Sequence, residues 1–407
     1  MKLFQQLLVA GATVSLIAPI AAQASNIVNF EEINSYASSE EESSILDSKS
    51  FANEISEDIA ILKGRIDGLE VQQNELEAGS FSDTTTLSGK VEMLLGAKDS
   101  QDNDENEATG DGFMLNYHYE IDLNTSFTGE DKLNIELAAG NQVSDSVAAL
   151  TDPLGETSDN LKMEDVNYTF PVGDWKFSVG DSMDASKNWP NACSYGNVVD
   201  ALGDCGAANS VDLSGDVSFS AGKDFDNGWS VGLGISANEG STSDGIFTDE
   251  GDDYYGVALG YESDSYGVTV AYSLKEDRSS ASGSTRAVDN ASASNDKTYY
   301  GATAYYNFDE FTISGGIEFM EPELSSDKES TQWTVGVSTD LGEGEISAGI
   351  GTNGAIDEDA EEIYAYEIKY SYPINDGLTI DTFAFVAENA GTTADDTGVG
   401  VLATFKF

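Results

Sequence analysis

The stretch FMLNYHYEIDLN, residues 113–124, alternates apolar and polar side chains along most of its length. In an extended strand, Tyr117 and Tyr119 would face one side and His118 the other. The stretch before it, TLSGKVEMLLGAK at 86–98, has the same period of two. A strand with one apolar and one polar face suits a sheet that separates lipid from water.

This period continues from residue 84 to the C-terminus in sixteen segments. Their approximate spans are 85–97, 112–124, 132–141, 160–170, 175–182, 213–223, 229–238, 253–262, 266–275, 298–307, 311–320, 331–341, 345–352, 361–372, 378–387 and 397–407. Many of them have about 9–11 residues, the length that a tilted membrane-spanning strand requires. The sequence therefore predicts an all-β fold over residues 81–407, a 16-stranded antiparallel transmembrane β-barrel.

The connections between these segments alternate in length. Six are short and carry turn residues: PVGD, DFDNG, SDS, FDE, GEG and NDG. Others are long and acidic, such as DSQDNDENEATGD at 99–111 and the run 276–297. Outer-membrane barrels have short periplasmic turns and long extracellular loops, and an even strand count leaves both barrel ends in the periplasm.

Two soluble all-β folds are the alternatives to a barrel. A β-sandwich would use Greek-key crossings instead of uniform hairpins, and a β-solenoid would show a fixed repeat period, which this sequence lacks. Aromatic placement also favours the barrel, because four strands open on Trp175, Trp229, Tyr266 or Phe311 just after a short turn. Such residues would form an aromatic girdle at one lipid–water boundary.

The N-terminus has the pattern of a secretory signal peptide. Lys2 precedes a long apolar run that ends at Ala22-Gln23-Ala24, a small-x-small cleavage site, so we assign residues 1–24 to the signal peptide. A membrane anchor is the alternative, but the run is short and Pro19 interrupts it. Residues 25–50 are rich in Ser, Glu and Asp and predict an acidic linker.

Residues 51–80 have the heptad pattern of a short coiled coil in the periplasm. The segment needs partner helices, because Gly64 and Gly68 each weaken an isolated helix by about 1 kcal/mol. An amphipathic helix lying on a domain is the alternative. The seam consists of Ile55, Ile59, Leu62, Ile66, Leu69, Gln73 and Leu76.

The formal net charge of −56 bounds the partners of the chain. It excludes nucleic acid, whose phosphates need a basic surface, and it favours the collection of cations. Adaptation to a salty medium explains the same charge equally well. No segment after the signal peptide has the roughly 18 consecutive apolar residues of a transmembrane helix.

The two cysteines, Cys193 and Cys205, lie in one loop of an exported chain and predict a disulfide. A metal site is not expected there, because no histidine or third cysteine lies nearby. The single histidine, His118, is mid-strand and is expected to face the lumen. With no GxSxG motif and no metal-ligand cluster, we expect no catalytic residues, no cofactor and no enzyme.

Three segments resemble the cyanobacterial outer-membrane porins of the Som type, relatives of the OprB carbohydrate-selective porins. They are ILKGRIDGLEVQQNELEAGSFSDTTTLSGKVEMLLGA at 61–97, NYTFPVGDWKFSVGD at 167–181 and YSYPINDGLTIDTFAFVAEN at 370–389. The terminal Phe407 is similar to the signal that outer-membrane barrels present to the barrel assembly machinery. Family members usually carry an S-layer homology domain before the coiled coil, and residues 25–50 are too few for one.

The resemblance implies a homotrimer in outer-membrane lipid, with a third long loop that narrows each pore. Here that loop is 183–212, stapled by the expected disulfide, and an ordinary extracellular loop is the alternative. We expect the loop to carry its constriction residues across the pore. These are Asp184, Lys187, Trp189, Asp200 and Asp204.

The leading hypothesis is passive diffusion of small hydrophilic solutes, either sugars or inorganic ions, through a water-filled pore. Cation preference is expected, because the three arginines lie outside the predicted strands and acidic residues are in large excess. The alternative is a structural or adhesive barrel with a plugged lumen and cation-binding acidic loops. The expected lumen lining includes Lys90, Glu92, Asn116, His118, Glu120, Asp122, Asn134 and Glu136.

Overall fold

The computed structural model describes residues 84–100, 112–142, 157–238, 240–241, 245–248, 251–276, 296–323, 327–391 and 395–407. The predicted signal peptide, linker and coiled-coil seam lie outside these ranges, as do the three arginines. The two long acidic connections at 99–111 and 276–297 lie mostly outside them as well. In this part of the chain, no helix is long and apolar enough to cross a membrane.

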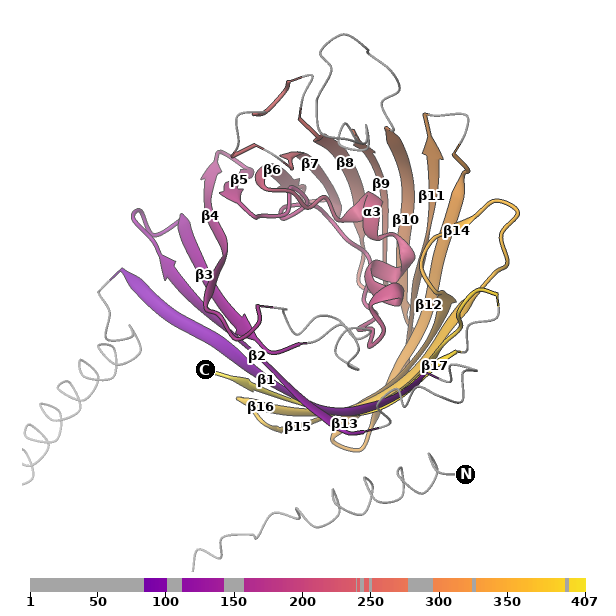
Figure 1. The fold of residues 1–407 in the computed structure, drawn as a ribbon. Coiled ribbons are helices and arrows are strands. Elements are labelled where there is room, and N and C mark those ends of the chain that lie inside the picture. The colour runs from indigo at the N-terminus through magenta and orange to yellow at the C-terminus, as the bar shows by residue number, and fades with distance from the viewer. Residues whose placement is uncertain are drawn as a thin grey trace, which may run out of the picture. The chain divides into compact units, whose positions relative to one another are not determined.

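The described residues form one antiparallel sheet whose first strand pairs with both β2 and β17, so the sheet closes into a barrel (Figure 1). The predicted 16-stranded barrel is confirmed, and a two-residue strand, β14, adds to it. The strands are β1 Thr85–Ser100, β2 Met114–Thr125, β3 Lys132–Gly140, β4 Lys162–Val172, β5 Trp175–Asp181, β6 Val217–Asp224, β7 Trp229–Ala237, β8 Asp253–Glu262, β9 Tyr266–Lys275, β10 Lys297–Asn307, β11 Thr312–Pro322, β12 Ser330–Leu341, β13 Gly344–Thr352, β14 Ile356–Asp357, β15 Tyr364–Asn375, β16 Leu378–Ala387 and β17 Asp396–Lys406.

Most strand ends lie within three residues of the prediction, and two features differ from it. The strand expected at 213–223 begins only at Val217, because the residues before it belong to a loop inside the barrel. The β14 strand was missed because its two residues are too few to show a period; it pairs with β12 at Ser330 and Thr331.

The strands alternate between the two faces as a lipid-embedded barrel requires. On β9, Tyr266, Val268, Val270 and Tyr272 point outward and are each at least 39% exposed. The residues between them are small and buried, because they face the packed interior of the barrel. The apolar side chains therefore lie where lipid would surround the barrel.

Aromatic rings line the outer face near the short turns. Starting at Trp229, ring centroids follow one another at 5.2, 5.9, 6.5, 4.6 and 4.5 Å. A second row on β4–β6 includes Trp175 and Phe177, whose centroids lie 6.3 Å apart. Rings with one apolar and one polar edge suit a membrane boundary. The first row consists of Trp229, Tyr261, Tyr266, Tyr306, Phe308 and Phe311.

The segment 182–216 between β5 and β6, here called the inner loop, lies inside the ring of strands (Figure 1). It contains the short helices η3 Asp200–Gly206 and α3 Ala208–Val211, which contact the inner faces of β9 to β13. The buried apolar clusters of the described residues lie between this loop and the wall. The apolar core of the described residues therefore lies at the contact between the inner loop and the barrel wall.

Candidate pore and its inner loop

One side of the barrel interior is a wall of charged side chains on β1 and β2. The register pairs Lys90 with Glu120 and Glu92 with His118, so all four share the inner face. Lys90 Nζ lies 3.2 Å from a Glu120 carboxylate oxygen and 3.5 Å from a Glu92 oxygen. Glu92 in turn lies 3.5 Å from His118 Nδ1. This histidine is part of a polar wall, as expected from the alternation.

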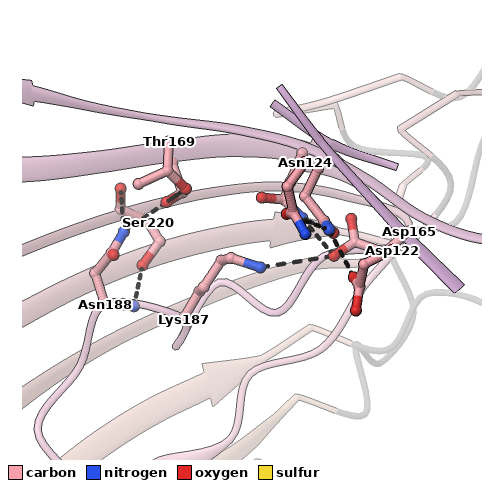
Figure 2. Close-up of polar contacts among 10 residues, drawn as sticks. Asp122, Asn124, Asp165, Thr169, Lys187, Asn188 and Ser220 are labelled. Atoms are coloured by element: carbon pink, nitrogen blue, oxygen red, sulfur yellow. Dashed lines mark hydrogen bonds and ion pairs between the residues drawn. The ribbon is translucent and has the colours of Figure 1, made fainter. Parts of the chain in front are cut away.

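An asparagine network continues the wall onto β3 and β4 (Figure 2). Asn134 Nδ2 donates to Asp122 at 2.7 Å and to Asn124 at 3.0 Å. Asn167 Nδ2 donates to Asp165 at 2.6 Å and to Asn134 at 3.3 Å. Amides that bridge neighbouring carboxylates hold them in fixed positions, so this side of the lumen presents a fixed pattern of acceptors.

Three carboxylates of this wall lie close enough to share one cation. One oxygen from each of Glu120, Asp122 and Glu136 lies within 4.8 Å of the other two. The cause is the register, which sets Glu120 opposite Ala138 and Asp122 directly opposite Glu136. Oxygen ligands in this number suit a hard, hydrated cation. All three side chains are half-buried, as expected of groups at the edge of a lumen.

The inner loop runs along the wall and then turns back, so that its outgoing and returning halves lie side by side. The Ala185 N–H donates to the Leu213 carbonyl at 2.7 Å, and the Ser186 hydroxyl donates to Asp212 at 3.0 Å. Further out, Cys193 and Cys205 form a disulfide with their Cα atoms 5.7 Å apart. The bridge joins the outgoing half of the loop to the returning half.

Glu367 of β15 holds the far end of the loop. Its carboxylate accepts the Tyr195 hydroxyl at 2.6 Å, the Val198 N–H at 2.9 Å and the Val199 N–H at 2.6 Å. The side chain is 6% exposed, so the three donors meet it in a dry environment where charge-assisted hydrogen bonds are strong. On the same strand, Lys369 Nζ donates to the Gly196 carbonyl at 2.7 Å. The far end of the loop is therefore bound by the Glu367 carboxylate and by the Lys369 ammonium group.

A second buried carboxylate holds the returning half. Glu318 of β11 is 3% exposed and accepts the Ser210 N–H at 2.6 Å and Asn209 Nδ2 at 3.0 Å. Lys275 Nζ donates to Asn209 Oδ1 at 3.2 Å. The role of Glu318 and Glu367 could not be predicted from the sequence, because alternation shows only that their side chains face inward. Nothing local distinguishes a glutamate that binds a loop from one that lines a pore.

An apolar contact completes the docking of the far end. Val198, Val199 and Leu202 pack against a patch of the inner wall that is apolar on β15, β16 and β1. Burying each such side chain contributes about 1.5–3 kcal/mol. The patch could not be recognised in the sequence, since apolar residues such as Met93, Leu95 and Val386 occupy the neighbouring outward positions and mask the alternation. Its wall residues are Leu94, Ala365, Phe383, Phe385 and Ala387.

The five expected constriction residues differ in where they lie. Asp184, Lys187 and Asp200 are exposed within the barrel, and Lys187 Nζ reaches toward Asp165 of the polar wall at 3.6 Å (Figure 2). Asp204 is half-buried and accepts Asn191 Nδ2 at 3.4 Å. The position expected for Trp189, across the pore, is wrong: its indole packs into the wall among glycines of β7 and β8. The loop follows the wall because wall residues beneath it are small.

The loop therefore lines one side of the lumen and the polar wall of β1–β4 lines the other. A closed barrel with an apolar exterior, a polar interior and an inward-folded loop is a channel-forming transmembrane β-barrel. Residues 77–394 match the family model of Gram-negative porins, and the chain belongs to that family. The family and the barrel fold point to an outer-membrane channel rather than to an enzyme.

Two further comparisons give related proteins. A stretch of 134 residues is 34% identical to the uncharacterized protein alr4550 of Nostoc sp. (strain PCC 7120), over 30% of this chain and 23% of that protein. The chain thus spans about a quarter of the length of this relative. Two variants of Rhodopseudomonas blastica porin each align over 79% of this chain and 100% of theirs, with 14% identity and a TM-score of 0.48.

Replacing Glu367 with alanine should free the far end of the inner loop without opening the barrel. Three donors would lose their acceptor, and each buried donor left without one costs about 1–3 kcal/mol. We expect the heat-modifiable gel migration of the barrel to be unchanged and the open-channel current noise in a planar bilayer to rise. Glu345→Ala is the matched control, since Glu345 shares this inner face but is exposed. Equal noise in both variants and the wild type would show that Glu367 does not hold the loop.

Proposed function

We propose that this porin is a water-filled, cation-preferring channel for passive diffusion of small hydrophilic solutes, either sugars or inorganic ions. The observation that carries the proposal is the acidic cluster of Glu120, Asp122 and Glu136 on the inner face of the wall. The resemblance of residues 61–97 to Som-type porins supports placing it among those of cyanobacteria.

Passive diffusion suits the kind of lining that the barrel has. Sixteen strands leave room for an aqueous channel even when a loop folds inside. The lumen-facing groups of the polar wall are held by one another, as in the contact of Lys90 with Glu120 and of Asn134 with Asp122. Such a wall offers many weak sites, and conduction requires binding that is weak enough to release the solute.

Cation preference follows from the sign of the charges that line the pore. The described residues include no arginine, and the lumen lysines are matched by acids, as Lys187 is by Asp165 and Lys90 by Glu92 and Glu120. Lys90 pairs with Glu120 at one side of the carboxylate triad. Rings and clusters of Asp and Glu concentrate cations and repel anions.

Reversal potentials in a KCl gradient should show that the wild-type channel prefers cations. The triple variant Glu120→Gln, Asp122→Asn, Glu136→Gln should lower the cation-to-anion permeability ratio by roughly two- to five-fold, since a nearby unit charge in water is worth about 1 kcal/mol before screening. Neutralising the exposed turn residues Glu310 and Glu343 is the control and should change the ratio little. An anion-selective wild type would contradict the proposed cation preference. A barrel without conductance would contradict the channel function and favour the alternative of a plugged lumen.

Part of this selectivity should depend on pH through Asp184 of the inner loop. Partial desolvation inside the barrel and the Asp212 carboxylate raise the pKa of Asp184 to about 6, while Lys187 opposes them and Asp165 adds to them. Asp184 is therefore charged above that pH and becomes neutral as the pH falls through it. Between pH 7 and pH 5 the cation preference should fall, and it should fall less in Asp184→Asn. An identical pH dependence in the two proteins would contradict the role of Asp184.

We also propose that the porin assembles as a homotrimer in outer-membrane lipid, with the coiled coil 51–80 extending into the periplasm. The heptad seam and the family resemblance support this assembly. The terminal Phe407, whose backbone exchanges hydrogen bonds with Gly89, is the proposed signal for the barrel assembly machinery. The mass of the detergent-solubilised protein, corrected for bound detergent, should be that of three chains. A monomer or dimer would refute the trimer.

A further inference from the structure

We infer that Trp189 is a positioning residue that sets the width of the lumen, because its indole fills a socket of glycines in the barrel wall. This inference rests on the proposed function as a channel. The socket lies on the inner faces of β7 and β8, at Gly232, Gly234 and Gly256. A Cβ atom at any of the three would overlap the indole or the loop backbone beside it.

The indole fits the socket because the glycines leave room for both of its rings. A Cβ at Gly256 would overlap the outer edge of the six-membered ring, and one at Gly232 would overlap the five-membered ring. The next residue, Pro190, lies in the same way over Gly260. Four wall positions without side chains therefore follow the path of two consecutive loop residues, so the depth to which the loop seats is set by these contacts.

The indole also borders a buried apolar cluster at the contact between the loop and the wall. Trp189 contacts a buried cluster made of Ala207 and Val211 from the loop and Ala258 and Ala271 from the wall. The ring therefore lies where the loop meets the wall. A rigid ring with only two rotatable bonds, packed at this contact, acts as a spacer between the loop and the wall.

No polar contact fixes the ring in this place. Among the described residues the buried indole Nε1 has no hydrogen-bond partner, and only the backbone N–H of Trp189 donates, to the Ser186 carbonyl at 2.8 Å. Dispersion and apolar burial hold the indole, and both depend on fit. If the socket is filled, we expect the ring and the loop that carries it to move away from the wall, toward the lumen.

The test is a cycle of three variants measured by single-channel conductance. Gly256→Val fills the socket and should lower the conductance about 1.5-fold, because the loop then narrows the free cross-section. Trp189→Ala should not lower the conductance but should increase current noise, because the loop loses its spacer. The double variant should return the conductance to that of Trp189→Ala, since the valine then occupies the space that the indole has left.

Ser371→Val is the matched control, since it adds similar bulk to an inner-face position of β15 away from the socket. Its conductance should stay close to that of the wild type. Each variant is first checked for heat-modifiable migration, and Gly256→Ala replaces Gly256→Val if the valine prevents assembly. The inference is overturned if Gly256→Val conducts like the wild type, if the double variant is no better than Gly256→Val, or if Trp189→Ala matches the wild type in both conductance and noise. A wild type without conductance would instead overturn the channel function.

Discussion

The closure of β1 onto β17 is the constraint on which the rest of the structure depends. In a hydrocarbon environment every backbone N–H and C=O needs a partner within the protein, and an open sheet edge would leave a row of them without one. The pairing runs from Lys90 and Lys406 to Ser100 and Asp396, and Phe407 extends it by a pair of backbone hydrogen bonds to Gly89. Once the ring is closed, the outer side chains meet lipid and the inner ones meet water or the inner loop.

A closed ring creates an interior that must be filled or left wet, and this protein does both. On β7 to β13, on β15 to β17 and at Leu94 of β1 the wall carries small or apolar residues, and the inner loop covers them. On β1 to β4 it carries charges and amides that stay beside the lumen. The loop has an irregular backbone with its own polar groups, so the wall supplies Glu318 and Glu367 as acceptors in the dry contact zone. Buried carboxylates are tolerated there because several donors meet each of them.

The disulfide and the wall contacts act on different parts of the same loop. Cys193–Cys205 joins the outgoing and returning halves to each other, and it does not attach the loop to the barrel. Attachment comes from the two glutamates, the apolar patch near Val199 and the seat of Trp189. A loop that is closed on itself and docked at several separate points is a suitable edge for a pore, because its fluctuations at one point are limited by the others.

The sequence by itself determined the barrel. A period of two is a local property of the chain, repeated in every strand, and the short turns between strands leave each hairpin only one register that keeps apolar residues outside. The two cysteines could pair only with each other within the chain, and alternation placed Asn134 and Glu136 on the lumen side. What only the tertiary structure decided was the path of the inner loop. Glu367 binds Val199 across 168 positions, and Gly256 receives the ring of Trp189 from a different hairpin. Such contacts depend on where closure brings distant strands, and a glutamate or glycine carries no local mark of the partner that closure will give it.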